Sequence, residues 1–208
     1  MRLFHRTVAA VAVGVALALA GSGCGSDGAA DGSAAELSDT EHNEADVAFA
    51  SDMIQHHAQA LSMVDLTLGR PLDPEVEALA EDIRAAQSPE VETMSDWLTD
   101  WGVEVPETMR DHANAGHDNE DMGHSMEGMD TDVPGMMTAE DMSALEKASD
   151  AAFQTQWLEM MIEHHAGAIE MARAEQEDGR YRPAVDLAGS IIDSQQAEIE
   201  QMEKLLGR

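Results

Sequence analysis

The chain has little cysteine and few aromatic residues. Among 208 residues there is one Cys, and aromatic residues make up 3% of the sequence. A single Cys excludes an internal disulfide and a closed structural zinc site built from several thiolates. The core must therefore be formed by aliphatic side chains and by 15 Met residues, and stability must come from packing between helices.

Basic residues are also scarce. Lys and Arg total 11 against 42 Asp and Glu, which gives a formal net charge of −31 at pH 7. A surface of this charge repels nucleic acid and attracts cations. The sequence also shows no phosphate-binding loop and no paired nucleophile and base. The negative charge therefore favours a cation-binding protein over a nucleic-acid-binding one.

Only one apolar run is long enough to suggest a membrane or export signal. It extends from Val8 to Ala20, follows Arg2 and Arg6, and is too short to span a bilayer as a helix. We therefore interpret residues 1–23 as a signal peptide, with lipidation at Cys24 and a flexible tether over residues 24–37.

A second cleavage site remains open within the same segment. Cleavage after Ala18-Leu19-Ala20 would release a secreted or periplasmic soluble protein. Gly21 stands where a lipoprotein signal usually has Leu, so the match is imperfect. We favour the lipoprotein, a cell membrane protein that faces outside the cytoplasm.

One short motif occurs twice. Met53-Ile54-Gln55-His56-His57 returns 108 positions later as Met161-Ile162-Glu163-His164-His165. The same offset relates Met63 to Met171, Leu79 to Leu187, Ile83 to Ile191, Gln87 to Gln195, Glu90 to Glu198, Met94 to Met202 and Leu98 to Leu206. A constant offset over this length indicates an internal duplication of a helical hairpin.

Cap and breaker residues predict where the first pair of helices lies. Ser38 with Glu41 suggests a capping box and a helix from about Asp39 to Leu68, which Gly69 ends. Asp73 and Pro74 suggest the start of a second helix that runs to about Trp101. Pro89 lies inside this helix, so we expect a kink or break over 85–89.

The second half repeats this pattern after a long crossover. Residues 102–137 lose helical periodicity and predict a flexible connection. Helix resumes after Thr138 with Asp141 completing a capping box, continues to about Glu177 with a break near 148–150, and returns from Pro183. The sequence therefore predicts an all-α domain over 38–208, a four-helix bundle of two hairpins with halves at about 38–101 and 138–208.

Polar and thioether groups recur on the helix faces expected to lie inside. A buried polar group without a partner costs about 1–3 kcal/mol, so the histidines and glutamates should bond one another or a metal. Both interpretations stay open, as does a role for Met as core filler. The helical candidates for metal ligation are Met53, His56, His57, Met63, Glu90, Met94, Met161, His164, His165, Met171, Glu198 and Met202.

The ligand types favour copper over other metals. Thioether and imidazole suit Cu(I), and imidazole with carboxylate suits Cu(II). Di-iron bundles use Glu-x-x-His motifs, which these histidines do not follow. The crossover contains a second set of the same donor types: His112, His117, Met122, His124, Met126 and Met129. These residues either capture a metal ion or are incidental members of an acidic loop.

The paired Met-Ile-x-His-His helices, with Trp97-Leu98 and Trp101-Gly102 closing the first half, resemble the exported bacterial "domain of unknown function 305" family. The resemblance covers roughly Asp46 to Leu206. It implies a ferritin-like fold and an association with extracytoplasmic copper. By position it implicates the Met and His residues of the first helix of each half, with the crossover as a second region.

These observations lead to one favoured function and two alternatives. We expect an extracytoplasmic copper sink or carrier that contributes to copper tolerance, with the metal ion and the membrane as partners. A metal-dependent redox enzyme on the same bundle is one alternative. A non-catalytic interaction module with a structural polar core is the other. Association into a homo-oligomer is left open.

Overall fold

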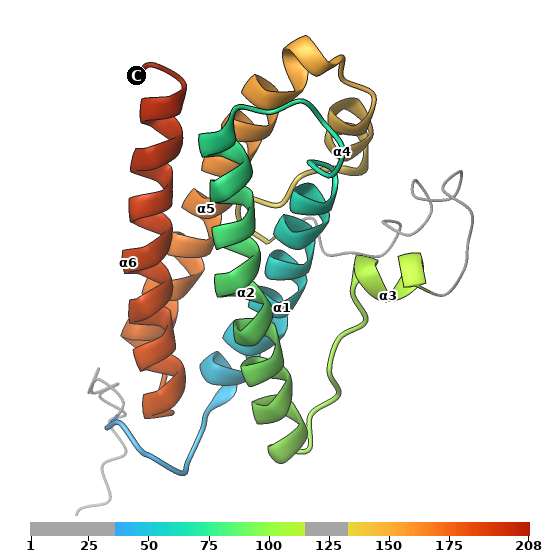
Figure 1. Ribbon diagram of the computed structural model, residues 1–208. Coiled ribbons are helices and arrows are strands. Elements are labelled where there is room, and N and C mark those ends of the chain that lie inside the picture. Colours follow the sequence, from blue (N-terminus) through green and yellow to red (C-terminus); the bar gives the residue numbers. More distant parts are fainter. Residues whose placement is uncertain (1–35, 115–132) are drawn as a thin grey trace, which may run out of the picture. The chain divides into compact units, whose positions relative to one another are not determined.

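The computed structural model describes residues 36–114 and 133–208, and helices dominate this part of the chain (Figure 1). The elements are α1 (Glu44–Asp65), α2 (Pro74–Asp100), α3 (Met109–Asn114), α4 (Ala139–Glu146), α5 (Asp150–Asp178) and α6 (Arg182–Leu205). Within the described residues, Ser38 and Tyr181 form an isolated parallel β-bridge. The predicted all-α class is confirmed.

Two helical hairpins make up the bundle. The helix α1 packs mainly on α2, and α5 packs mainly on α6, while α1 and α5 bring the hairpins together. This is the arrangement expected for two hairpins joined by a long crossover. Within the described residues, no helix combines the length and apolar character needed to cross a membrane.

The start of α1 differs from the prediction. The helix begins at Glu44, where Asn43 and Asp46 form the capping box, so the predicted start near Asp39 is wrong. The Ser38 hydroxyl instead accepts hydrogen bonds from the backbone N–H groups of Thr40 and Glu41, in a turn that does not continue as helix. An Asx cap closer to the apolar run therefore defines the boundary.

The helix α2 begins at Pro74 as predicted, but it runs without interruption to Asp100. Of the kink or break predicted over 85–89, the break is wrong, because Pro89 lies within a continuous helix, and the kink stays a prediction. The break near 148–150 is confirmed, since α4 ends at Glu146 and α5 begins at Asp150. The Thr138 capping box is also confirmed.

The crossover is more structured at its ends than predicted. The short helix α3 lies within the segment expected to lack helix. Residues 133–136 form a turn, closed by a hydrogen bond from the Met136 N–H to the Val133 carbonyl, in which Gly135 takes a positive φ of 75°. Residues 115–132 lie outside the described part of the chain.

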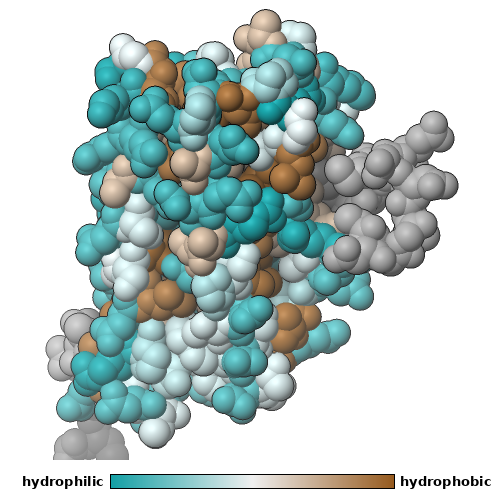
Figure 2. Space-filling model, in the orientation of Figure 1, coloured by the Kyte–Doolittle hydropathy of each residue, from teal (hydrophilic) through white to brown (hydrophobic). Residues whose placement is uncertain are grey.

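Methionines contribute to both parts of the core. Met63, Met161 and Met202 pack in one apolar cluster with Phe153 and Trp157. Met53 and Met94 pack in a second with Phe49 and Leu98. The face seen in Figure 2 is largely hydrophilic with scattered apolar patches, which fits the acidic composition.

Candidate metal centre

The two His-His motifs meet in the middle of the bundle. His56 and His57 on α1, and His164 and His165 on α5, are all fully buried. The imidazole rings of His56 and His164 lie with their centroids 3.7 Å apart and their planes at 39°. Residues that are 108 positions apart in the chain therefore touch across the interface between the hairpins.

The outer histidine of each motif is held by a glutamate. His57 Nε2 lies 2.7 Å from Glu90 Oε2, and His165 Nε2 lies 2.7 Å from Glu198 Oε2. A carboxylate accepts the hydrogen, so Nε2 donates in each pair. Such a carboxylate partner fixes both the ring orientation and the tautomer, as it does for many histidines that bind metals.

This tautomer leaves Nδ1 with a lone pair. Nδ1 of His57 and Nδ1 of His165 are buried and have no hydrogen-bond partner. His56 is arranged in the same way, because its Nε2 lies 3.1 Å from the Pro134 carbonyl oxygen while its Nδ1 has no partner. Neither ring nitrogen of His164 has a partner in good hydrogen-bond geometry, although the backbone of His56 interacts with this ring. Buried nitrogens of this kind are costly unless a ligand satisfies them.

The central histidines are neutral. Burial, followed by the nearby imidazoles, lowers the pKa of both His56 and His164 well below its usual value. A neutral imidazole is the form that binds a metal ion. The centre therefore presents metal-competent nitrogens without first having to lose protons.

The end of the crossover covers this centre, which sequence reasoning missed. Gln59 donates to the Met137 carbonyl at 2.8 Å and accepts from the Met137 N–H at 2.7 Å. A Cβ atom at Gly167 would lie 2.2 Å from the Pro134 carbonyl oxygen, so only glycine permits this approach. Gly167 is an isolated glycine inside a helical pattern, a signal of close packing that the sequence interpretation did not use.

The predicted methionine ligands are divided between the two core clusters. Met53 and Met94 lie in one, and Met63, Met161 and Met202 lie in the other. Met171 is partly buried and lines a pocket at the end of α5. The bundle therefore supplies thioethers from both hairpins, although it does not gather all six in one place.

Most of the predicted crossover donors lie outside the described part of the chain. His112 belongs to α3, but its side chain is not among those described. His117, Met122, His124, Met126 and Met129 lie outside the described residues. Among the side chains that the structure describes, no three His, Cys, Asp or Glu form a ready metal-binding group.

Fold and centre together define an all-α helical bundle with a buried, carboxylate-supported histidine cluster. The chain belongs to the DUF305 family, described as a domain of unknown function, which matches residues 46–206. A DUF305 fragment from Deinococcus radiodurans is 29% identical with a TM-score of 0.62, over 80% of this chain and 97% of that one. A DUF305 protein from Streptomyces coelicolor, described as a candidate secreted protein, is 31% identical with a TM-score of 0.64, over 78% and 92%.

Structures of the protein CopM are also similar to this chain. The Cu(I)-bound form is 27% identical with a TM-score of 0.58, over 77% of this chain and 94% of that one. The Cu(II)-bound form is 30% identical with a TM-score of 0.57 over the same shares. No curated protein sequence matches the chain. The comparisons thus associate this fold with copper in a relative.

Proposed function

We propose that this protein binds copper outside the cytoplasm, as a sink or carrier that contributes to copper tolerance. The observation that carries the proposal is the unpartnered Nδ1 atom of each motif histidine, since His56, His57 and His165 each direct Nε2 to an oxygen. This arrangement orients a metal ligand and leaves its lone pair available. The copper-bound forms of CopM support the same choice of metal.

Buried thioethers favour Cu(I) in the bundle. Met53 and Met161 come one helical turn before His57 and His165 and are fully buried. Soft thioether and neutral imidazole ligands select Cu(I) over harder ions. The half-buried Glu90 and Glu198 orient the outer histidines in this proposal, and the crossover Met and His residues form a second region that captures ions.

The surface and the N-terminus fit this role. A net charge of −31 concentrates cations around the protein. In the proposal, residues 1–23 direct export and Cys24 carries the lipid that holds the protein at the membrane. The relative described as a candidate secreted protein supports export.

A competition titration tests the metal and its location. The mature protein with Cys24→Ser is titrated with Cu(I) and with Cu(II) against a chromogenic chelator. It is compared with His57→Ala/His165→Ala, with His42→Ala as an exposed control, and with a variant in which the crossover donors are replaced by serine: His112, His117, Met122, His124, Met126 and Met129. Tight binding that is lost only in the double His variant supports the bundle site.

The other outcomes are equally informative. Loss of binding only in the crossover variant would move the site to that segment. Binding no tighter than that of a generic acidic protein of similar charge would contradict a copper function and favour the interaction module. Turnover of Cu(I) or Fe(II) under oxygen would favour the redox enzyme.

A further inference from the structure

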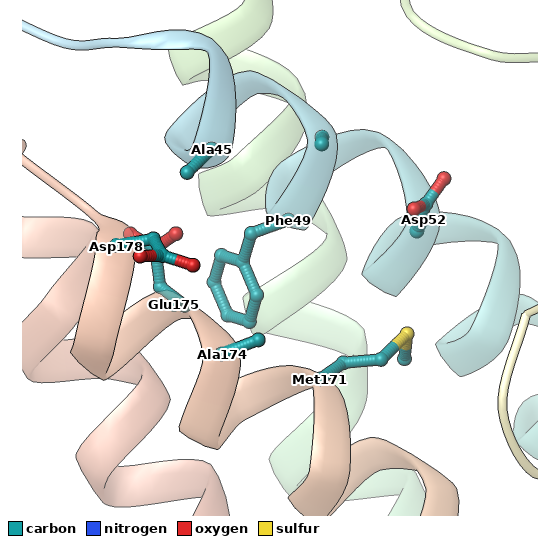
Figure 3. Close-up of a pocket in the computed structure, with 8 residues that line it drawn as sticks. Ala45, Phe49, Asp52, Met171, Ala174, Glu175 and Asp178 are labelled. Carbon is teal, nitrogen blue, oxygen red and sulfur yellow. The ribbon is translucent and has the colours of Figure 1, made fainter. Parts of the chain in front are cut away.

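A pocket of about 180 Å³ lies between α1 and α5, where α1 begins and α5 ends. Its walls are mainly apolar and include Phe49 and Ala174. Figure 3 shows the Phe49 ring pointing toward Ala174, with the carboxylates of Glu175 and Asp178 to one side of the ring. The pocket is therefore an apolar hollow with an acidic edge.

Glu175 is an unusual residue for such a position. It is 2% exposed, and no hydrogen-bond donor reaches either of its carboxylate oxygens. Burial, a side-chain hydrogen bond with Asp46, and the charges of Asp46 and Asp178 raise the pKa of Glu175 to about 9. At neutral pH this carboxyl group keeps a proton, which it donates to Asp46, and its ionised form is left without a partner.

The opposite end of the bundle provides an internal comparison. Asp46 Oδ1 accepts a hydrogen bond from the Tyr181 N–H at 2.8 Å. Gln154, 108 positions after Asp46, accepts one from the Asp73 N–H at the same 2.8 Å. Thr67 stands at the position that corresponds to Glu175. Because a neutral Thr serves at one end, packing does not require Glu175 at the other, whereas Asp46 also accepts from the Asn43 N–H in the α1 capping box.

The same comparison explains why the pocket is open. Ala45 corresponds to Phe153, and Ala174 corresponds to Leu66, so smaller side chains leave the space empty. Asp178 corresponds to Arg70, whose guanidinium carbon lies 4.4 Å from the centre of the Phe153 ring. One end of the bundle is thus filled by an aromatic ring and a cation of the chain itself.

We propose that the pocket between α1 and α5 binds an organic cation, an amidinium, guanidinium or ammonium group on a flat apolar body. The body lies against Phe49 and Ala174, and the charged group lies between Glu175 and Asp178. Such a ligand would place an apolar group and a cation where the other end of the bundle has the Phe153 ring and the Arg70 guanidinium. The negative end of the α5 dipole favours the same charge.

Other occupants fit the pocket less well. Residues 24–35 and 115–132 contain no Lys or Arg, so these segments cannot supply the cation. Within the described residues no group of three His, Cys, Asp or Glu is arranged for a metal ion, and the walls here are mostly apolar. An organic cation satisfies both the acidic edge and the apolar wall. The proposal is independent of the copper function.

Benzamidine is a suitable cationic probe, because two compounds of nearly the same shape serve as controls. Benzamide is neutral, and benzoate carries the opposite charge. Calorimetric titration of the mature Cys24→Ser protein should show that benzamidine binds. Benzamide should bind at least about tenfold more weakly, and benzoate should not bind. Glu175→Gln should weaken benzamidine binding about tenfold or more. Ala174→Leu, which introduces the side chain of Leu66, should abolish it by filling the pocket.

Matched controls and pH separate this site from general attraction to an acidic protein. Glu170→Gln removes an exposed charge from α5 and should leave binding unchanged. The other titratable or charged groups that face this carboxyl group are Asp46, Asp178, Asp52 and Arg180. When benzamidine binds, Glu175 releases its proton to the solvent. Benzamidine affinity should therefore rise from pH 6.5 toward 9. Amidinium keeps its charge over this range.

Two results would overturn the proposal. One is the absence of benzamidine binding at millimolar concentration, and the other is equal affinity for the wild type, Glu175→Gln and Ala174→Leu. Circular dichroism confirms that each variant is folded, and two variants with different chemistry protect the test against a local rearrangement. Copper titration of Glu175→Gln should match the wild type, so failure here is distinct from failure of the copper function.

Discussion

The imidazole rings of His56 and His164 lie 3.7 Å apart between their centroids, on helices that belong to different hairpins. Burial keeps both rings neutral. Two protonated rings at this separation would repel each other in a site without water to screen them. The contact therefore joins the two halves of the bundle only while the histidines are unprotonated or bound to another ligand.

The stability of the metal-free protein should fall as the pH falls below 6.5. In the unfolded chain, His56 and His164 take up protons below about pH 6.5, whereas burial prevents this in the folded protein. The unfolded state then binds more protons, so each histidine lowers the free energy of unfolding by about 1.4 kcal/mol per pH unit. Urea unfolding of wild type and His164→Gln from pH 5 to 7 should show a shallower slope in the variant. The control variant His42→Gln changes an exposed histidine and should keep the wild-type slope of unfolding free energy against pH. The same slope in His164→Gln and the wild type would contradict a neutral, buried His164.

Glu175 should produce the opposite trend. Its folded pKa of about 9 lies above its ordinary value of 4.5, so between these limits the folded state holds a proton that the unfolded state has lost. Its contribution to the free energy of unfolding is fully present below pH 4.5 and decreases by about 1.4 kcal/mol per pH unit until about pH 9. Urea unfolding between pH 6.5 and 9 should show this decrease in wild type and not in Glu175→Gln. A decrease of the same size in both proteins would show that Glu175 is ionised in the folded state.

Gly167→Ala should destabilise the protein because the added Cβ would meet the Pro134 carbonyl oxygen at 2.2 Å. Backbone cannot yield as a flexible side chain does, so we expect a loss of about 1–3 kcal/mol in the free energy of unfolding. Gly189→Ala is a matched control within α6, since its nearest neighbour is the side-chain Nε2 of Gln176 at 3.0 Å. That variant should be neutral or stabilised by up to about 1 kcal/mol. Similar urea midpoints for the two variants would argue against tight packing of the crossover on α5.

Pro89→Ala should stabilise α2. Pro89 lies inside a continuous helix and cannot donate a backbone hydrogen bond to the carbonyl one turn earlier. The corresponding position in the second half is Ala197, which shows that the fold accepts alanine there. We expect a gain of up to about 3 kcal/mol in the free energy of unfolding, measured with urea, and no change in copper affinity. A loss of stability would indicate that the helix geometry around Glu90 depends on the proline.

The fold was largely predictable from the sequence because its signals are local and repeated. Helical periodicity, Pro74, Pro183 and the Thr138 cap identified the helices, and the two His-His motifs identified the buried centre. The start of α1 was missed because Ser38 and Asn43 both offer a cap, and only packing decides between them. The break at Pro89 was wrong because the packing of α2 on α1 outweighs one missing hydrogen bond.

The parts of the centre that were missed depend on contacts between distant segments. The Pro134 carbonyl reaches His56 across 78 positions, and the pairing of Gln59 with Met137 spans the same separation. No spacing rule connects such residues in the sequence. The pairing of Asp46 with Glu175 was missed for the same reason.

X-ray absorption at the copper edge is the most direct test of the proposed function. The mature Cys24→Ser protein is loaded with one equivalent of Cu(I), alongside His56→Ala/His164→Ala and His57→Ala/His165→Ala. The proposal predicts imidazole nitrogen together with thioether sulfur around the copper in the wild type, and a reduced imidazole contribution in both variants. A first shell of oxygen donors alone, or the same spectrum in all three proteins, would contradict a copper centre built on the buried histidines.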